Sequence, residues 1–147
     1  MPATAIPASI DALVTATRTA VGQAAQVLDG PPVRNVERDL VCVGYSTQRL
    51  SAEGSQVPAS MGQARSEDFD VVCSASSWSG DNATKVVRDR ASALVDLVEA
   101  GLVADPRLGG AVLRAVFGDT VVLDQVQVGE GVAATIEFTV RIRAMVR

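Results

Sequence analysis

The stretch IEFTVRIRAMVR, residues 136–147, has the sharpest pattern in the chain. Every second position holds an apolar residue, and the positions between them are polar or charged apart from Met145. Successive side chains of a strand point to opposite faces of a sheet, so this alternation predicts a strand with one buried face and one open face. Strands of this kind are typical of antiparallel sheets.

Two further strands are expected immediately before it. Residues 111–117 and 121–128 have strand character, and Gly118-Asp119 is expected to make a tight connection between them. Gly129-Glu130-Gly131 is expected to turn the chain into the final strand. The C-terminal part of the sequence therefore predicts an antiparallel meander.

Two strands are also predicted earlier in the chain. The continuous apolar run Leu40-Val41-Cys42-Val43, within residues 39–45, suits a strand that is covered on both faces. Residues 69–76 alternate between apolar and polar positions over most of their length. Between these strands, residues 46–68 show no sustained period, and we expect a long loop there.

Two helices complete the predicted elements. Residues at helical spacing begin at Ile10, where Ser9 is expected to cap the helix. Asp29-Gly30-Pro31-Pro32 then predicts a turn. A second helix is expected over residues 83–100, with Gly101 closing it.

This order of elements predicts an α+β fold. We expect a mixed, mostly antiparallel sheet of about five strands, with two main helices packed on one face. Residues 1–147 are expected to form a single domain, with a long loop at about residues 46–68.

The composition argues against several classes of function. Histidine is absent, which removes the commonest general base and metal ligand. There is no P-loop or GxGxxG motif, and Lys85, the only lysine, stands in no SxxK arrangement. Aromatic residues are few, and the net charge of −4 is the opposite of a phosphate-binding footprint. We therefore expect a binding or assembly protein that is not an enzyme and holds no cofactor or metal.

The cysteines and the acidic residues support the same expectation. Cys42 and Cys73 belong to no CxxC motif, so we expect two thiols in the core. Glu67, Asp68 and Asp70 lack the spacing and central glycine of a calcium loop, and we interpret them as a solvated strand entrance. No apolar run approaches a membrane span and residues 1–22 lack signal-peptide features, so we expect an intracellular, reduced and soluble protein.

Several segments together form a more specific pattern through their order and spacing. Besides the opening helix and the Asp29-Gly30-Pro31-Pro32 turn, they are Gly62-Gln63-Ala64-Arg65 through Glu67, Phe69-Asp70-Val71-Val72-Cys73, Ser79-Gly80-Asp81, the second helix with Arg88, Arg90-Ala91, Leu94 and Val98-Glu99, Asp105-Pro106-Arg107-Leu108-Gly109-Gly110, and Phe138-Thr139-Val140-Arg141-Ile142-Arg143-Ala144. This pattern resembles the tail terminator proteins of long-tailed phages that infect actinobacteria. The similarity covers nearly the whole chain, and its motifs are structural rather than catalytic.

The resemblance implies a small α+β subunit that closes into a ring, hexameric in relatives, on the end of a finished tail tube. Such a ring stops polymerisation of the major tail tube protein and presents the docking surface for the head completion or connector proteins. DNA passes through its lumen without specific binding, and no membrane is involved. The protein would be assembled in the cytoplasm of the host bacterium and would lie at the head–tail junction of the virion.

Two groups of residues are candidates for contacts with a neighbouring subunit or the tube. Arg141, Arg143 and Arg147 give the final strand a one-signed face, which either pairs with acidic residues of a neighbour or is a solvated outer face. The long segment 46–68 either makes such contacts or is a surface loop. Its candidate side chains are Arg49, Arg65 and Glu67.

Two alternatives stay open. The chain could be another small phage component, such as a head–tail connector or head completion protein. From a different class, it could be a small-ligand binding domain or a minimal enzyme that uses aspartate and serine. A deep pocket with convergent polar groups would favour the second alternative, and a flat self-complementary surface would not.

Overall fold

The strand that the alternating pattern predicts lies inside the sheet. The computed structural model describes residues 2–33, 36–47, 49–58 and 64–146. In it, β6 (Gly131–Val146) lies between β4 (Arg65–Ser79) and β5 (Arg114–Val128) and is antiparallel to both. The apolar side chains of the alternation are all buried, namely Ile136, Phe138, Val140, Ile142, Ala144 and Val146. The predicted antiparallel strand with a buried apolar face is thus confirmed.

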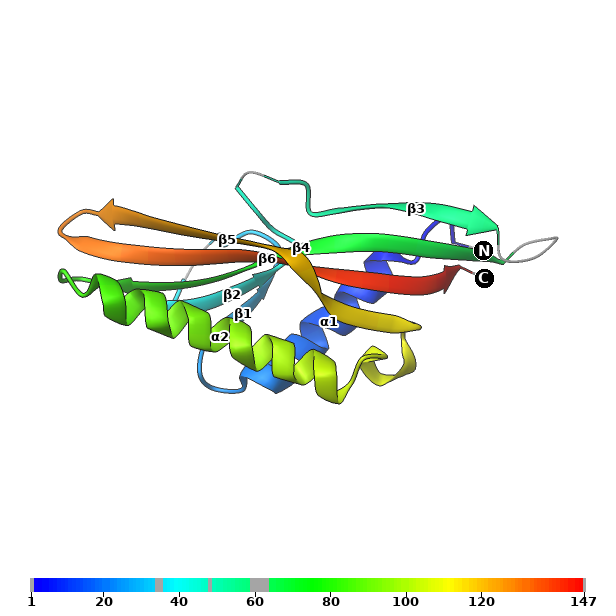
Figure 1. The fold of residues 1–147 in the computed structure, drawn as a ribbon, viewed down its shortest axis with the longest axis horizontal. Helices are drawn as coiled ribbons and strands as arrows, with labels where there is room; N and C mark the ends of the chain where they lie inside the picture. Colours follow the sequence, from blue (N-terminus) through cyan, green and yellow to red (C-terminus); the bar gives the residue numbers. More distant parts are fainter. Residues whose placement is uncertain (1, 34–35, 48, 59–63, 147) are drawn as a thin grey trace.

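The sheet has six strands in the order β1–β2–β4–β6–β5, and β3 pairs with the other end of β4 (Figure 1). β1 (Gln26–Asp29) runs parallel to β2 (Asp39–Val43). Every other pair, including β3 (Ala52–Pro58) with β4, is antiparallel. The predicted α+β fold with a mixed, mostly antiparallel sheet is confirmed. The sequence pattern does not predict β1 or β3.

Two helices cover one face of the sheet, which we call the helix face, and the opposite face is the open face (Figure 1). α2 (Thr84–Ala104) packs on β4, β5 and β6, and α1 (Ile6–Val21) packs on β1, β2 and α2. The core forms where the apolar stripes of both helices meet the inward positions of the sheet. Its central side chains include Leu13, Val14, Val87, Ala91, Leu94, Val41, Phe69, Val71 and Phe138.

The expected long loop at residues 46–68 is wrong. β3 occupies Ala52–Pro58 and pairs with the first half of β4, which already begins at Arg65. The described side chains of β3 are exposed or half-buried, so backbone pairing rather than an apolar pattern holds this strand. Gly62 and Gln63, which belong to the pattern that resembles tail terminator proteins, lie outside the described residues.

The expected turn at Gly118-Asp119 is also wrong, because β5 passes through it as one strand. The pairing register with β6 shifts between Phe117 and Val121. A Cβ atom at position 118 would lie 2.1 Å from Oγ1 of Thr139, so the glycine permits a close approach of β6 rather than a turn. The predicted turn before the final strand is confirmed, since β5 and β6 pair up to Val128 and Gly131.

The first helix begins and ends earlier than predicted, and the second is longer than predicted. α1 begins at Ile6, so Ser9 lies buried inside the helix instead of capping it. α2 continues through Gly101 to Ala104. A Cβ atom at position 101 would lie 2.6 Å from Cβ of Ala20 in α1. Gly101 therefore allows the two helices to come into contact and does not end α2.

Candidate assembly surface

The arginines of β6 lie on the open face, each beside an aspartate of β4. Arg143 donates from Nε and Nη2 to the two carboxylate oxygens of Asp68, at 3.0 and 3.2 Å. Nη1 of Arg141 lies 3.8 Å from Oδ1 of Asp70. The antiparallel register of β4 and β6 places these partners opposite each other. The face is therefore not one-signed, because the sheet supplies the opposite charges within the chain.

The other sequence candidates lie on other elements. Arg49 is exposed in the segment between β2 and β3, where it lines a hollow on the open face together with Asp70, the partner of Arg141. Nη2 of Arg65 donates to the carbonyl oxygen of Ala3 at 3.2 Å, so this side chain ties the N-terminal segment to β4. Arg147 lies outside the described residues. Within the described residues, the structure brings only Arg141 and Arg143 of these arginines together on one strand.

Glu67 is buried and anchors the start of α1. Its Oε1 accepts the backbone N–H of Ala5 at 2.7 Å, and its Oε2 accepts the hydroxyl of Thr4 at 2.6 Å and the amide of Gln56 at 2.8 Å. Burial opposes ionisation, but these hydrogen bonds and the charge of Arg65 outweigh it and hold the pKa of Glu67 below its ordinary value. The carboxylate caps α1 from the neighbouring sheet.

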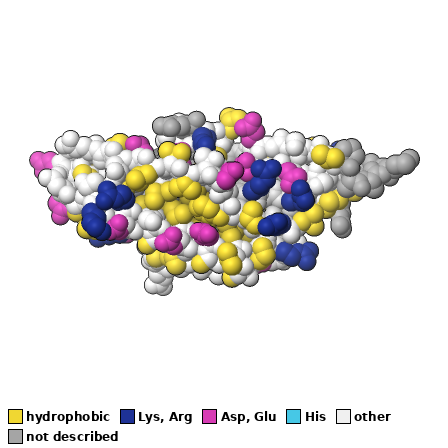
Figure 2. All heavy atoms as spheres, viewed as in Figure 1, with side chains coloured by type: hydrophobic (Ala, Val, Ile, Leu, Met, Phe, Trp, Pro, Cys, Tyr) yellow, Lys and Arg dark blue, Asp and Glu magenta, His cyan; other side chains and the backbone are white. Residues whose placement is uncertain are grey.

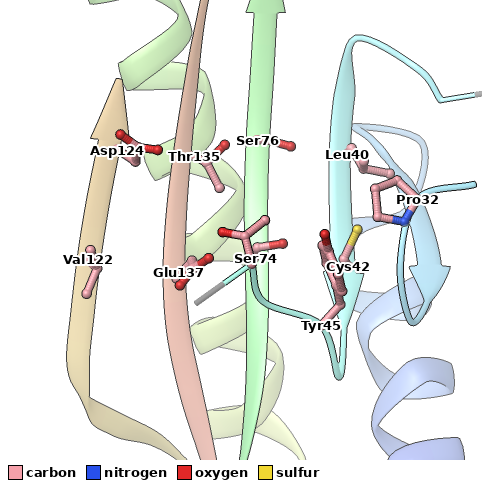
Figure 3. A pocket seen from close by; sticks show the side chains of 11 residues that line it. Pro32, Leu40, Cys42, Tyr45, Ser74, Ser76, Val122, Asp124, Thr135 and Glu137 are labelled. Carbon is pink, nitrogen blue, oxygen red and sulfur yellow. The ribbon is translucent and has the colours of Figure 1, made fainter. Parts of the chain in front are cut away.

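A hollow of about 240 Å³ lies on the open face between β2 and β5 (Figure 3). Its volume is below the roughly 300–1,000 Å³ of typical small-molecule sites. Two carboxylates line it, and Oε2 of Glu137 accepts the hydroxyl of Ser46 at 2.9 Å. The strand residues that line it are Leu40, Cys42, Ser74, Ser76, Val122, Asp124, Thr135 and Glu137. No group of three or more His, Cys, Asp or Glu among the described residues is placed to hold a metal ion.

The two cysteines are free and buried, as predicted, and they lie on neighbouring strands. Burial raises the pKa of Cys42, and this effect outweighs a hydrogen bond with Ser74 that lowers the pKa. Burial also raises the pKa of Cys73 to about 12. Both thiols therefore stay protonated at neutral pH, and neither is an activated nucleophile.

β5 forms one edge of the sheet, and its second half is exposed. It pairs with β6 on one side, and no described strand pairs with it on the other. Five large apolar side chains are 39–55% exposed there, namely Val121, Val122, Leu123, Val126 and Val128. We call residues 121–128 the apolar edge.

The apolar edge presents apolar side chains on both faces of the sheet. Val121 and Leu123 pair with buried residues of β6 and lie on the helix face, whereas Val122 and Val126 lie on the open face. Figure 2 shows hydrophobic side chains gathered where β5 and β6 run alongside α2. Soluble proteins rarely leave such an edge uncovered, so it is the strongest candidate for contact with another chain. The sequence does not reveal it, because only the strand order shows that β5 is an edge.

Comparison with protein-family models and with curated proteins finds no match for this chain. Within the part of the chain that the structure describes, no helix has the length and apolar character that crossing a membrane requires. The residues and geometry of the chain itself therefore carry the functional proposal.

Proposed function

We propose that this chain is a phage tail terminator, a structural protein that forms a ring on the end of the tail tube. The observation that carries the proposal is the apolar edge of β5, which gives the domain an unpaired surface suited to assembly. The resemblance of the sequence to tail terminators of long-tailed phages indicates that the assembly is a ring on a tail tube. The ring, hexameric in that family, ends growth of the major tail tube protein and receives the head completion proteins.

The charge of the chain supports passage of DNA through such a ring. The net charge is −4 per chain, and a negative potential repels phosphate groups that a basic lumen would retain. Arg141 and Arg143 add little free positive charge, because Asp70 and Asp68 lie beside them. The DNA would pass without specific binding, at the head–tail junction of a virion assembled in the bacterial cytoplasm.

The alternative of a small-ligand binding domain has weaker support. The hollow between β2 and β5 is small, and a larger one, about 400 Å³ between α1 and α2, is lined mainly by alanine, threonine and glycine. Asp105, the one carboxylate that lines the larger hollow, accepts the backbone N–H of Gly109. A third hollow, about 330 Å³ on the open face, is lined by Arg49, Leu50, Glu53, Asp70, Val72, Thr120 and Thr139. The hollow beside Arg49 gathers polar groups, but its volume is near the lower limit of small-molecule sites, and its Asp70 lies 3.8 Å from Arg141.

Tail assembly in infected cells tests the proposal. Depletion of this chain should give tails of uncontrolled length that do not join heads, because nothing ends tube growth. Resupply of the chain should restore uniform tails. Normal tail length and head joining without the chain would contradict the proposal. Uniform tails that fail only to join heads would instead identify a connector or head completion protein.

A further inference from the structure

We propose that the apolar edge of β5 pairs antiparallel with β1 of a second copy of this chain, so that one sheet continues into the next. The inference names the strand that each neighbour contributes to the ring, and it rests on the proposed assembly function. Four observations support it. The second half of β5 lacks the features that protect edge strands, and the two edges run in opposite directions. Their facing side chains are apolar, and a second copy would cover the exposed side chains of β5.

The apolar edge lacks the usual protection of an edge strand. Residues 121–128 pair with β6 without a register shift, and they contain no proline, lysine or arginine. Asp124 is the only charged residue among them. Prolines, bulges and charged side chains are the features that keep edge strands from pairing with other molecules. The outward backbone groups of this segment are therefore open to a strand from another chain.

β1 is the opposite edge of the same sheet, and its direction fits. β5 runs in the direction of β4, and β1 runs in the opposite direction. A second copy that continues the sheet with the same face up therefore presents β1 antiparallel to β5. Each contact then uses two different edges, which is the heterologous type of contact that can close into a ring.

Paired residues form rows that run across the strands of the sheet. When these rows are continued into the second copy, apolar residues lie beside apolar residues. On the helix face one row runs through Leu123, Ile136, Ala75, Val41 and Val27. Continued into the next copy, this row places Leu123 beside Val27, and the neighbouring row on the open face places Val122 beside Leu28. β3, the other outer strand on that side, exposes Glu53, Ser55 and Gln56 and suits an apolar partner less well.

A second copy also supplies the layer that the helix face of the edge lacks. α1 packs on β1, so a copy joined through β1 brings α1 beneath the end of the neighbouring β5. Val121 and Leu123, which are 55% and 45% exposed, would then be covered from below. A single extended peptide would pair with the backbone but bring no such layer. Exposure on both faces therefore favours a folded copy over a peptide.

Disulfide cross-linking tests the pairing directly. Val27→Cys in one chain and Leu123→Cys in another should form linked dimers when the two variants assemble together under mild oxidation. Each variant alone should stay unlinked, and the wild-type chain controls for the buried Cys42 and Cys73. Cross-linking of Leu123→Cys with itself would show that β5 pairs with β5 and would overturn the inference. So would the absence of cross-links both in the purified protein and on assembled tails.

A charge variant separates this inference from the proposed function. Val122→Lys with Val126→Lys should reduce the ring to single chains that stay folded, as circular dichroism would show. Val86→Lys with Val103→Lys, at exposed positions of α2, is the matched control and should keep the ring. A ring that survives the edge variant overturns the inference, even where tails end normally. Cross-links from β1 to β5 in a protein that does not end tails would uphold the inference and reject the function.

Discussion

Glu67 caps α1 from a strand, through a contact between residues 62 positions apart in the chain. Its two oxygens accept three hydrogen bonds, and one of these comes from the backbone N–H that precedes the helix. Ser9, the cap that the local sequence predicts, lies inside the helix. Local signals also mark the true start, since Pro7 lies in the first turn and the hydroxyl of Thr4 accepts the N–H of Ile6 at 3.1 Å. The prediction from Ser9 passes over them and places the start four residues late, at Ile10 instead of Ile6.

Glu67→Gln should lower the free energy of unfolding by about 1–3 kcal/mol, because the new amide nitrogen would face hydrogen-bond donors. Glu53→Gln on β3 is the matched control, since Glu53 is exposed, and it should change stability by less than about 0.5 kcal/mol. Urea unfolding of both variants measures the difference. A Glu67→Gln protein as stable as the wild type would contradict the cap.

The same cap predicts a pH dependence. The pKa of Glu67 is lower in the folded than in the unfolded chain, where it is about 4.3. Its contribution is therefore fully present above that pH and is lost as the pH falls through the folded value. The stability difference between the wild type and Glu67→Gln should shrink below about pH 4. Unfolding curves between pH 3 and pH 7 check this, and a difference that stays constant would refute it.

At the scale of helices and strands, Gly101 sets the distance between α1 and α2. Gly101→Ala should destabilise the protein by about 1–3 kcal/mol through overpacking, which exceeds the gain of up to about 1 kcal/mol in helix propensity. Ala20→Gly in the same chain removes the opposing methyl group and should recover part of the loss. Thermal unfolding of the single and double variants gives the coupling. Purely additive effects would show that the two residues do not meet.

The sequence predicts the elements whose own side chains fill the core. The buried face of β6 and the two amphipathic helices are examples, because their periodicity reflects burial in the core. β3 and β1 escape prediction for the opposite reason. They are short outer strands with half-buried or exposed described side chains, and their pairing partners define them.

The candidate surface is predicted only in part. The alternation of β6 places Arg141 and Arg143 on one face, but their partners Asp68 and Asp70 depend on the register with β4. The apolar edge depends on the strand order, since the same residues in a central strand would be paired on both sides. Register and strand order are long-range properties, and a single sequence carries little information about them.

Across the whole molecule, Arg141 and Arg143 of the open face have partner carboxylates within the same chain. Arg141→Glu with Arg143→Glu places like charges beside Asp70 and Asp68 and should lower the melting temperature slightly, because exposed ion pairs are screened by solvent. The ring should keep its mass, because these pairs lie away from the apolar edge. Adding Asp68→Arg and Asp70→Arg should restore the stability. Sedimentation and thermal unfolding measure both effects, and a ring lost at unchanged stability would place the interface at the arginines.

Assembly through the apolar edge is the central claim, and the native mass of the protein tests it most directly. We expect the wild-type chain, alone or on tail tubes, to form a closed ring whose mass is a whole multiple of one chain. Val122→Lys with Val126→Lys should have the mass of a single chain under the same conditions, because lysines at these positions disfavour edge pairing. A wild type that stays monomeric even with tail tubes, or an edge variant with the mass of the wild-type ring, would contradict the claim.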